Sequence, residues 1–174
     1  KMKKLLFIAL VAICGAFTVN AQTAKFGLKA GYVNISAKEK YQDVSASISE
    51  SGFYLGALAD ITMSESFHIQ PEVNYANAEE TSFLYIPVLA KYYISDSGFQ
   101  VMAGPQANIV LEEAMEGINN FGLDLTFGVA YDIDEHFFVE ARYSFELTNR
   151  IKDGGEYDVS GRFNTLFVGI GYKF

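Results

Sequence analysis

Residues 137–146 have the sequence Phe-Phe-Val-Glu-Ala-Arg-Tyr-Ser-Phe-Glu, in which apolar and polar side chains alternate. Successive side chains of a β-strand point to opposite faces, so this alternation predicts a strand with two different faces. One face carries only apolar side chains, and the other carries Glu140, Arg142 and Glu146. The stretch therefore predicts a strand that separates an apolar environment from a polar one.

The same alternation recurs along the chain from Lys25 to the C-terminus, in stretches of roughly ten residues. The stretches are 25–35, 51–61, 67–76, 83–93, 99–109, 121–131, 137–146 and 162–174. Short connections at 62–66, 94–98 and 132–136 alternate with mostly longer ones at 36–50, 77–82, 110–120 and 147–161. An even number of antiparallel strands, with short turns at one end and long loops at the other, is typical of bacterial outer-membrane barrels.

Two kinds of eight-stranded barrel fit this pattern, and they differ in which face points outward. A soluble lipocalin-like barrel places its apolar face inside around a ligand, whereas a membrane barrel places it against lipid. The positions of the aromatic residues favour the membrane barrel, because rings gather at both ends of the apolar faces and aliphatic side chains lie between them. We therefore predict an all-β fold, an eight-stranded antiparallel up-and-down transmembrane β-barrel. Its terminal Phe174 is expected to act as an assembly signal.

The composition of the 174 residues agrees with this prediction. Hydrophobic residues make up 50% of the chain, aromatic residues 15% and charged residues 20%, which excludes a disordered tail or a coiled coil. The formal net charge is −8, with 13 Lys and Arg against 21 Asp and Glu. Phosphate binding needs clustered basic residues, so we expect no nucleic-acid partner.

The first residues are predicted to direct export. Lys1, Lys3 and Lys4 precede an apolar run from Leu5 to Phe17, and residues 18–21 follow it with a cleavage site after Ala21. This is the layout of a cleaved secretory signal peptide over residues 1–21. The barrel domain then covers residues 22–174. The single cysteine, Cys14, lies within the predicted signal, so the mature chain is expected to form no disulfide.

Several runs resemble those of the small PorT-type outer-membrane β-barrel family of Bacteroidota. They are Phe67–Glu72, Tyr85–Tyr92, Ala103–Gln106, Val139–Tyr143 and Val168–Phe174, together with the signal end Asn20-Ala21-Gln22. The resemblance covers nearly the whole mature chain and implies an outer-membrane location and a barrel fold. Its motifs are structural, so it implies little about activity, although it permits an accessory role in an export or uptake complex.

All three prolines, Pro71, Pro87 and Pro105, fall inside predicted strands. A proline removes one donor from the hydrogen-bond ladder, and a closed barrel has no free edge at which to place it. We therefore expect a β-bulge beside at least one of them, which would invert the facing of part of that strand.

The polar faces of the strands are expected to meet inside the barrel, where eight strands leave just enough room for side chains. The charged members of this predicted interior network are Lys29, Asp60, Glu72, Lys91, Asp124, Glu140, Arg142 and Lys173, with Glu146 at the end of its strand. Near balance of acids and bases favours an ion-pair plug over a lined solute path, because an unpaired buried charge is costly. Arg142 is the expected centre, since its planar fork can bridge Glu72 and Glu140.

The predicted loops are acidic and define a second candidate region. Its residues are Glu79, Glu80, Glu112, Glu113 and Glu116. Such a rim can gather divalent cations or a basic protein partner at the cell surface, or it can simply keep the loops solvated.

No enzymatic motif was found, so we expect no catalytic residue, no cofactor and no dedicated metal site. The two histidines, His68 and His136, lie at the short-turn end, and neither belongs to a Gly-x-Ser-x-Gly or His-Glu-x-x-His motif. The predicted role is non-enzymatic: envelope structure or surface interaction through extracellular loops, with both termini in the periplasm. The alternatives are a narrow porin-like channel for small solutes and an accessory subunit of an export or uptake complex.

Overall fold

The structure is a computed structural model, and it describes residues 24–41, 44–112, 118–151 and 159–174. Eight strands and one short 3-10 helix follow one another along the chain. They are β1 (Ala24–Tyr41), β2 (Val44–Thr62), β3 (Phe67–Ala78), β4 (Thr81–Tyr93), η1 (Ser95–Ser97), β5 (Phe99–Val110), β6 (Phe121–Asp132), β7 (Phe137–Glu146) and β8 (Val159–Lys173). The predicted signal peptide lies outside the described residues.

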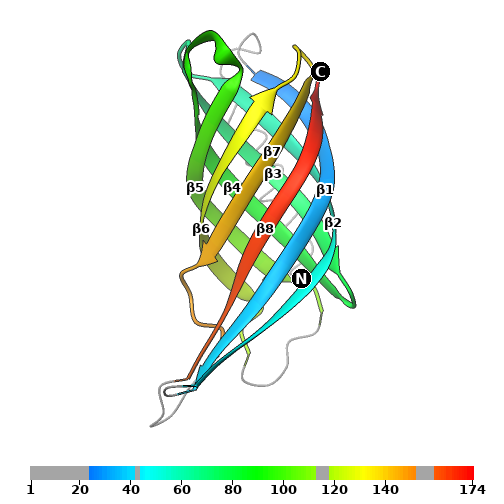
Figure 1. The fold of residues 1–174 in the computed structure, drawn as a ribbon, viewed down its shortest axis with the longest axis vertical. Coiled ribbons are helices and arrows are strands. Elements are labelled where there is room, and N and C mark those ends of the chain that lie inside the picture. Colours follow the sequence, from blue (N-terminus) through cyan, green and yellow to red (C-terminus); the bar gives the residue numbers. More distant parts are fainter. Residues whose placement is uncertain (1–23, 42–43, 113–117, 152–158) are drawn as a thin grey trace, which may run out of the picture.

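Each strand pairs antiparallel with its neighbour in sequence, and β1 also pairs with β8, which closes the barrel (Figure 1). This confirms the predicted fold class. We call the end that carries the connections 62–66, 94–98 and 132–136 the turn end, and the opposite end the loop end. Both β1 and β8 begin or finish at the turn end, where the amide of Phe174 donates to the carbonyl of Phe26 at 2.8 Å.

The polarity of the barrel is inverted relative to a soluble protein. The eight charged residues predicted for the interior are each at most 4% exposed, whereas Phe26 is 61%, Leu55 54% and Val129 54% exposed on the outer wall. A soluble barrel would bury the apolar face, so this arrangement suits a barrel surrounded by lipid. In the described part of the chain, no helix is long and apolar enough to cross a membrane.

Two connections expected as loops are strand pairs in the structure. Between residues 36 and 50 the β1–β2 ladder continues to Tyr41↔Val44, and β8 pairs with this part of β1 as far as Tyr41↔Val159. The three strands together project beyond the rest of the barrel at the loop end, and we call this part the extension (Figure 1). Residues 45–51 alternate Ser with other residues, but Ile48 is their single large apolar side chain, whereas the other strands were found by a series of such side chains on one face.

The second of these connections, at 77–82, is a tight hairpin turn. Ala78 pairs with Thr81, so only Glu79 and Glu80 lie between β3 and β4. Glu79 has a φ of 51°, in the left-handed region that such two-residue turns require.

The expected β-bulge beside a proline is absent from the described strands, so that prediction was wrong. On both sides of Pro71 the β2–β3 register is the same, with Leu58↔Glu72 and Ile61↔Ile69. The β3–β4 register is likewise the same on both sides of Pro87, with Pro71↔Val88 and Asn74↔Tyr85. The β4–β5 register is the same on both sides of Pro105, with Pro87↔Gln106 and Ala90↔Ala103. Each proline therefore interrupts the backbone hydrogen bonding only next to itself, and the inward and outward faces of β3 to β5 are preserved.

Candidate functional site

Four charged side chains meet in the middle of the barrel, and we call them the middle cluster. The ammonium group of Lys29 lies 2.7 Å from Glu72 Oε2 and 2.9 Å from Glu140 Oε1. Arg142 Nη1 lies 2.7 Å from Glu72 Oε2, and its Nη2 lies 3.3 Å from Glu140 Oε1. The structure thus places Arg142 between the two carboxylates that the sequence analysis named for it. Two cations and two anions alternate here without access to water, so their charges balance.

Neutral donors add hydrogen bonds to both oxygens of Glu72 and to one oxygen of Glu140, whereas Glu140 Oε2 has no partner among the described residues. Gln70 and Asn74 donate to Glu72 at 2.7 and 2.9 Å, and the hydroxyl of Tyr54 donates to Glu140 at 2.9 Å. The guanidinium group of Arg142 also lies 5.1 Å from the ring centre of Phe167, a cation–π contact. These contacts fix the rotamers of the cluster and fill the interior at this level.

A second set of ion pairs, the turn-end cluster, lies nearer the short turns. Asp60 accepts from Lys91 at 2.9 Å and lies 2.5 Å from Nδ1 of His68. Lys173 pairs with Asp132 at 2.9 Å. Asp132 begins the turn 132–136 and was not among the predicted network residues, since the sequence alone gave no reason to prefer it.

The third set, the loop-end cluster, comprises Asp124, Glu146 and Arg150. Arg150 Nε donates to Glu146 Oε1 at 2.8 Å, and its Nη1 donates to the backbone carbonyl of Asn120 at 3.1 Å. Arg150 is 3% exposed, although the sequence analysis assigned it to a loop. Its separation of four residues from Glu146 was the available signal, but on an extended chain that spacing does not by itself indicate contact.

Apolar side chains form layers between these clusters. Tyr54, Tyr85 and Phe167 are at most 1% exposed and pack edge to face, with ring centres 5.2 Å apart for Tyr54–Phe167 and 5.1 Å for Tyr85–Phe167. They lie on the loop-end side of the middle cluster and we call them the aromatic layer. A second apolar cluster of Leu89, Met102 and Ala130 lies nearer the turn end.

Glycines on the inner face make this packing possible. A Cβ atom at Gly169 would lie 2.3 Å from the Tyr54 hydroxyl oxygen, and one at Gly171 would lie 2.1 Å from Cζ of Phe138. Gly169 and Gly171 therefore provide space for large inward rings.

Three of the acidic loop residues lie in the described part of the chain, and they belong to two different connections. Glu79 and Glu80 are exposed in the β3–β4 turn, and Glu112 accepts a hydrogen bond from the backbone amide of Ser82 at 2.8 Å. Glu113 and Glu116 lie outside the described residues. Glu112 thus connects the beginning of its loop to the start of β4.

The two histidines have separate environments at the turn end. The ring of His68 packs against that of Tyr93 with ring centres 4.6 Å apart and an angle of 47° between the ring planes, whereas His136 stacks on Tyr172 with ring centres 5.2 Å apart. Within residues 24–41, 44–112, 118–151 and 159–174, no group of three or more His, Cys, Asp or Glu side chains is arranged to hold a metal ion.

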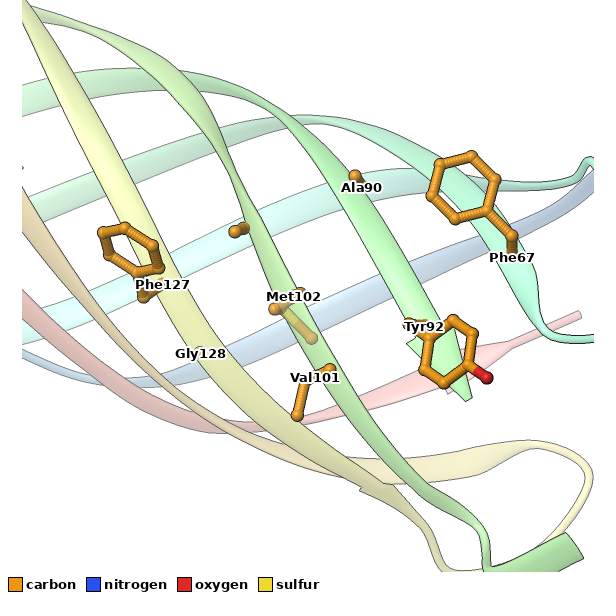
Figure 2. A pocket seen from close by; sticks show the side chains of 8 residues that line it. Phe67, Ala90, Tyr92, Val101, Met102, Phe127 and Gly128 are labelled. Atoms are coloured by element: carbon orange, nitrogen blue, oxygen red, sulfur yellow. The ribbon is translucent and has the colours of Figure 1, made fainter. Parts of the chain in front are cut away.

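The outer wall carries a shallow apolar groove of about 320 Å³. Figure 2 shows the rings of Phe67 and Tyr92 toward one side and that of Phe127 toward the other, with Ala90 and Val101 among them. The groove forms because small side chains lie between large rings on the outer wall. Acyl chains of membrane lipid are suited to occupy such an apolar groove.

Comparisons with known proteins give the family and the fold. The family model described as "Outer membrane protein beta-barrel domain" matches residues 6–174. Neisserial surface protein A is 19% identical over 88% of this chain and 100% of its own, with a TM-score of 0.51. Ail, the attachment invasion locus protein of Yersinia pestis, in complex with the heparin analogue sucrose octasulfate, is 15% identical over 88% of this chain and 100% of its own, with a TM-score of 0.50.

A third similar structure is OprG from Pseudomonas aeruginosa, 15% identical over 87% of this chain and 96% of its own, with a TM-score of 0.48. A search of curated proteins found no match. At these identities the two structures with TM-scores of 0.51 and 0.50 establish the fold, whereas the family model covers nearly the whole sequence. The chain therefore belongs to the outer membrane protein β-barrel domain family and is an integral β-barrel of the bacterial outer membrane.

Proposed function

We propose that this protein is a non-enzymatic, non-conducting outer-membrane barrel that acts through its extension and loops, as a structural or interacting component of the cell surface. The observation that carries the proposal is the filled interior. A porin-like channel needs a continuous wet path, and the complete burial of Tyr54 and Phe167, which are each 0% exposed, argues against such a path at the level of the aromatic layer.

The extension supports the interaction part of the proposal. It projects beyond the rest of the barrel and exposes residues such as Ile48, which is 69% exposed. In this proposal the turn end and both termini face the periplasm, and the extension and loops face outward, because outer-membrane barrels have short periplasmic turns and longer extracellular loops. Lipid surrounds the outer wall, and a protein partner or divalent cations are the candidates for binding at the acidic loops.

Within the family, we place the chain with the small PorT-type barrels of Bacteroidota, on the sequence runs that resemble them. Export through a signal peptide cleaved after Ala21 is part of the same proposal. An accessory role in an export or uptake complex is the second function that this placement permits. It differs from a free-standing surface protein in requiring a stable complex that can be purified with the barrel.

Single-channel recording in a planar bilayer tests the central part of the proposal. The wild-type protein is expected to insert without stable conductance steps. A variant with Tyr54→Ala and Phe167→Ala, which removes two rings of the aromatic layer, serves as the comparison in which steps can appear. Reproducible steps in the wild-type protein that change in the Tyr54→Ala/Phe167→Ala variant would instead favour the channel.

The interaction part has its own test. The extension can be shortened by deleting matched segments of β1 and β2 between Lys38 and Ser47, which removes strand pairs beyond the barrel body. The shortened protein is expected to fold and to lose the binding partners that cross-link to the wild-type protein on intact cells. Unchanged cross-linking would refute a role for the extension.

A further inference from the structure

The extension has a strand edge without a neighbouring strand. The β1–β2 ladder runs to Tyr41↔Val44, but the β2–β3 ladder stops at Gly52↔Ala78. Residues 44–51 of β2 therefore have β1 on one side, and we call their other side the open edge. In the described part of the chain, no backbone group from outside β1 hydrogen-bonds to these residues. Such an edge presents donors and acceptors with which another strand can pair.

The opposite side of the extension is closed by the chain that follows β7. The β7–β8 ladder ends at Ser144↔Thr165, but hydrogen bonds to β8 continue beyond it. The backbone amide of Arg150 donates to the carbonyl of Gly161 at 3.1 Å, and the amide of Gly161 donates to Asn149 Oδ1 at 3.0 Å. The two sides of the extension thus differ, and β2 provides the open one.

The backbone groups at the open edge belong to alternate residues of β2. The carbonyl of Glu50 accepts a hydrogen bond from the side chain of Asn34 in β1 at 3.2 Å, so it points toward β1. Backbone groups of successive residues point to opposite sides of a strand. The amides and carbonyls of Ser47, Ser49 and Ser51 therefore point to the open edge, and the side chains of these serines are exposed.

The sequence at the open edge lacks the features that usually prevent pairing. Natural edge strands are blocked by Lys, by Pro or by a β-bulge. Residues 44–51 are Val-Ser-Ala-Ser-Ile-Ser-Glu-Ser, without Lys, Arg or Pro, and their register with β1 contains no bulge. Ile48 is 69% exposed beside this edge. The edge is thus accessible, and it carries an apolar side chain that a partner strand can cover.

We propose that the open edge binds an extended segment of another protein as an added β-strand. This binding mode rests on the surface-interaction role proposed for the extension, and it specifies the partner. Directly opposed side chains of neighbouring strands interact, so the partner segment should place an apolar side chain opposite Ile48 and a Lys or Arg opposite Glu50. The backbone supplies most of the contacts, and these two side chains supply the selectivity.

A second copy of this chain in the same membrane does not fit the open edge. Two such copies are related by a rotation axis along the membrane normal. Pairing of two β2 edges by a twofold axis requires that axis to be parallel or perpendicular to the strands. Barrel strands tilt by about 35–45° from the normal, and the strands of the extension run obliquely (Figure 1). The partner in the same membrane or outside it is therefore a different chain.

A defined peptide tests strand addition. The probe is a fluorescent peptide of alternating threonine and valine with a lysine at each end, and fluorescence anisotropy measures its binding to the full-length protein purified in detergent. Ser49→Pro removes one amide donor from the open edge and leaves the pairing with β1, so it should weaken peptide binding about tenfold or more. Ser49→Ala keeps the amide and should bind the peptide as the wild-type protein does. The same peptide with methylated backbone amides should not bind.

Hydrogen exchange provides a second measurement that needs no variant. The amides of Ser47 and Ser49 should exchange rapidly in the free protein and slowly with the peptide bound. Equal peptide affinity of the wild-type protein and folded Ser49→Pro, or unchanged exchange at these amides, would overturn strand addition. If shortening the extension nevertheless abolishes cross-linking on cells, the surface-interaction role stands and only its proposed mode is rejected.

Discussion

Replacing Arg142 with methionine tests the middle cluster, because Arg142 is the cation that contacts both of its carboxylates through one planar group. Methionine keeps most of the aliphatic stem and removes the charge. Lys29 then remains alone between Glu72 and Glu140, so one buried negative charge loses its counter-charge.

The expected change in the free energy of unfolding follows from the one buried carboxylate that Arg142→Met leaves without a counter-charge. Removal of one partner from a buried ion pair costs about 3–5 kcal/mol, so Arg142→Met is expected to lower the free energy of unfolding by that amount. The double variant Arg142→Met/Glu140→Gln leaves Lys29 paired with Glu72 and restores the balance. Its loss is expected to be smaller than that of Arg142→Met by about 1–3 kcal/mol, a coupling typical of residues in one network.

The assay is urea-dependent unfolding in phospholipid vesicles, followed by the β-sheet circular dichroism. Arg162→Met, which removes an exposed arginine of β8, is the matched control and should change stability by less than about 0.5 kcal/mol. Two results would refute the ion-pair role of Arg142. One is a loss of unfolding free energy in Arg142→Met no larger than that in Arg162→Met, and the other is a loss in the double variant equal to the sum of the losses in Arg142→Met and Glu140→Gln.

Three further predictions concern other parts of the barrel. Gly171→Ala should destabilise it by about 1–3 kcal/mol, because the new Cβ would lie 2.1 Å from Cζ of Phe138, and Phe138→Leu should restore part of the loss in urea unfolding. In the exposed turn 132–136, the backbone amides of Phe137 and His136 donate to Asp134 and lower the pKa of its carboxyl group. The stabilisation by Asp134 is complete above the pKa of about 4 that its carboxyl group has in the unfolded chain, and it is lost as the pH falls through the lower pKa of the folded protein. Asp134→Asn should therefore remove this pH dependence from a series of unfolding temperatures. An unchanged pH profile in Asp134→Asn would contradict the prediction. Phe174→Ala should reduce the amount of barrel assembled in the outer membrane of cells while the purified protein refolds normally, and equal assembly would exclude Phe174 as an assembly signal.

The strands of the barrel body could be predicted closely because each has two chemically different faces. In 137–146, for example, the alternation of Val139, Ala141 and Tyr143 with Glu140 and Arg142 indicates the extended conformation and the two faces, and the positions of the aromatic residues indicate which face points outward. The extension escaped prediction because its strands lie outside the apolar band and lack that contrast. Backbone hydrogen bonding between β1 and β8 maintains these strands, and the pattern of polar and apolar side chains does not indicate such backbone pairing.

The interior residues could be named from the sequence, but most of their partners could not. Which inward side chains meet depends on the tilt and stagger of the strands, which bring Lys29 of β1 to Glu140 of β7. Arg150 was missed for a related reason, since it lies beyond the last alternating residue and turns back into the barrel. The bulge expected at the prolines was wrong because the ladder resumes in the same register on both sides of each proline.

The most direct test of the account is whether the apolar face contacts lipid while the extension lies outside the membrane. Residues 22–174 contain no cysteine, so single cysteines can be placed at Leu55 and Val168 on the outer wall and at Ser47 on the extension, and each can be labelled with a fluorophore. Nitroxide lipids labelled deep in the acyl chains are expected to quench the fluorophores at Leu55 and Val168 and to leave the one at Ser47 bright. Equal quenching at all three positions, or no quenching at Leu55 and Val168 in the folded protein, would contradict the account.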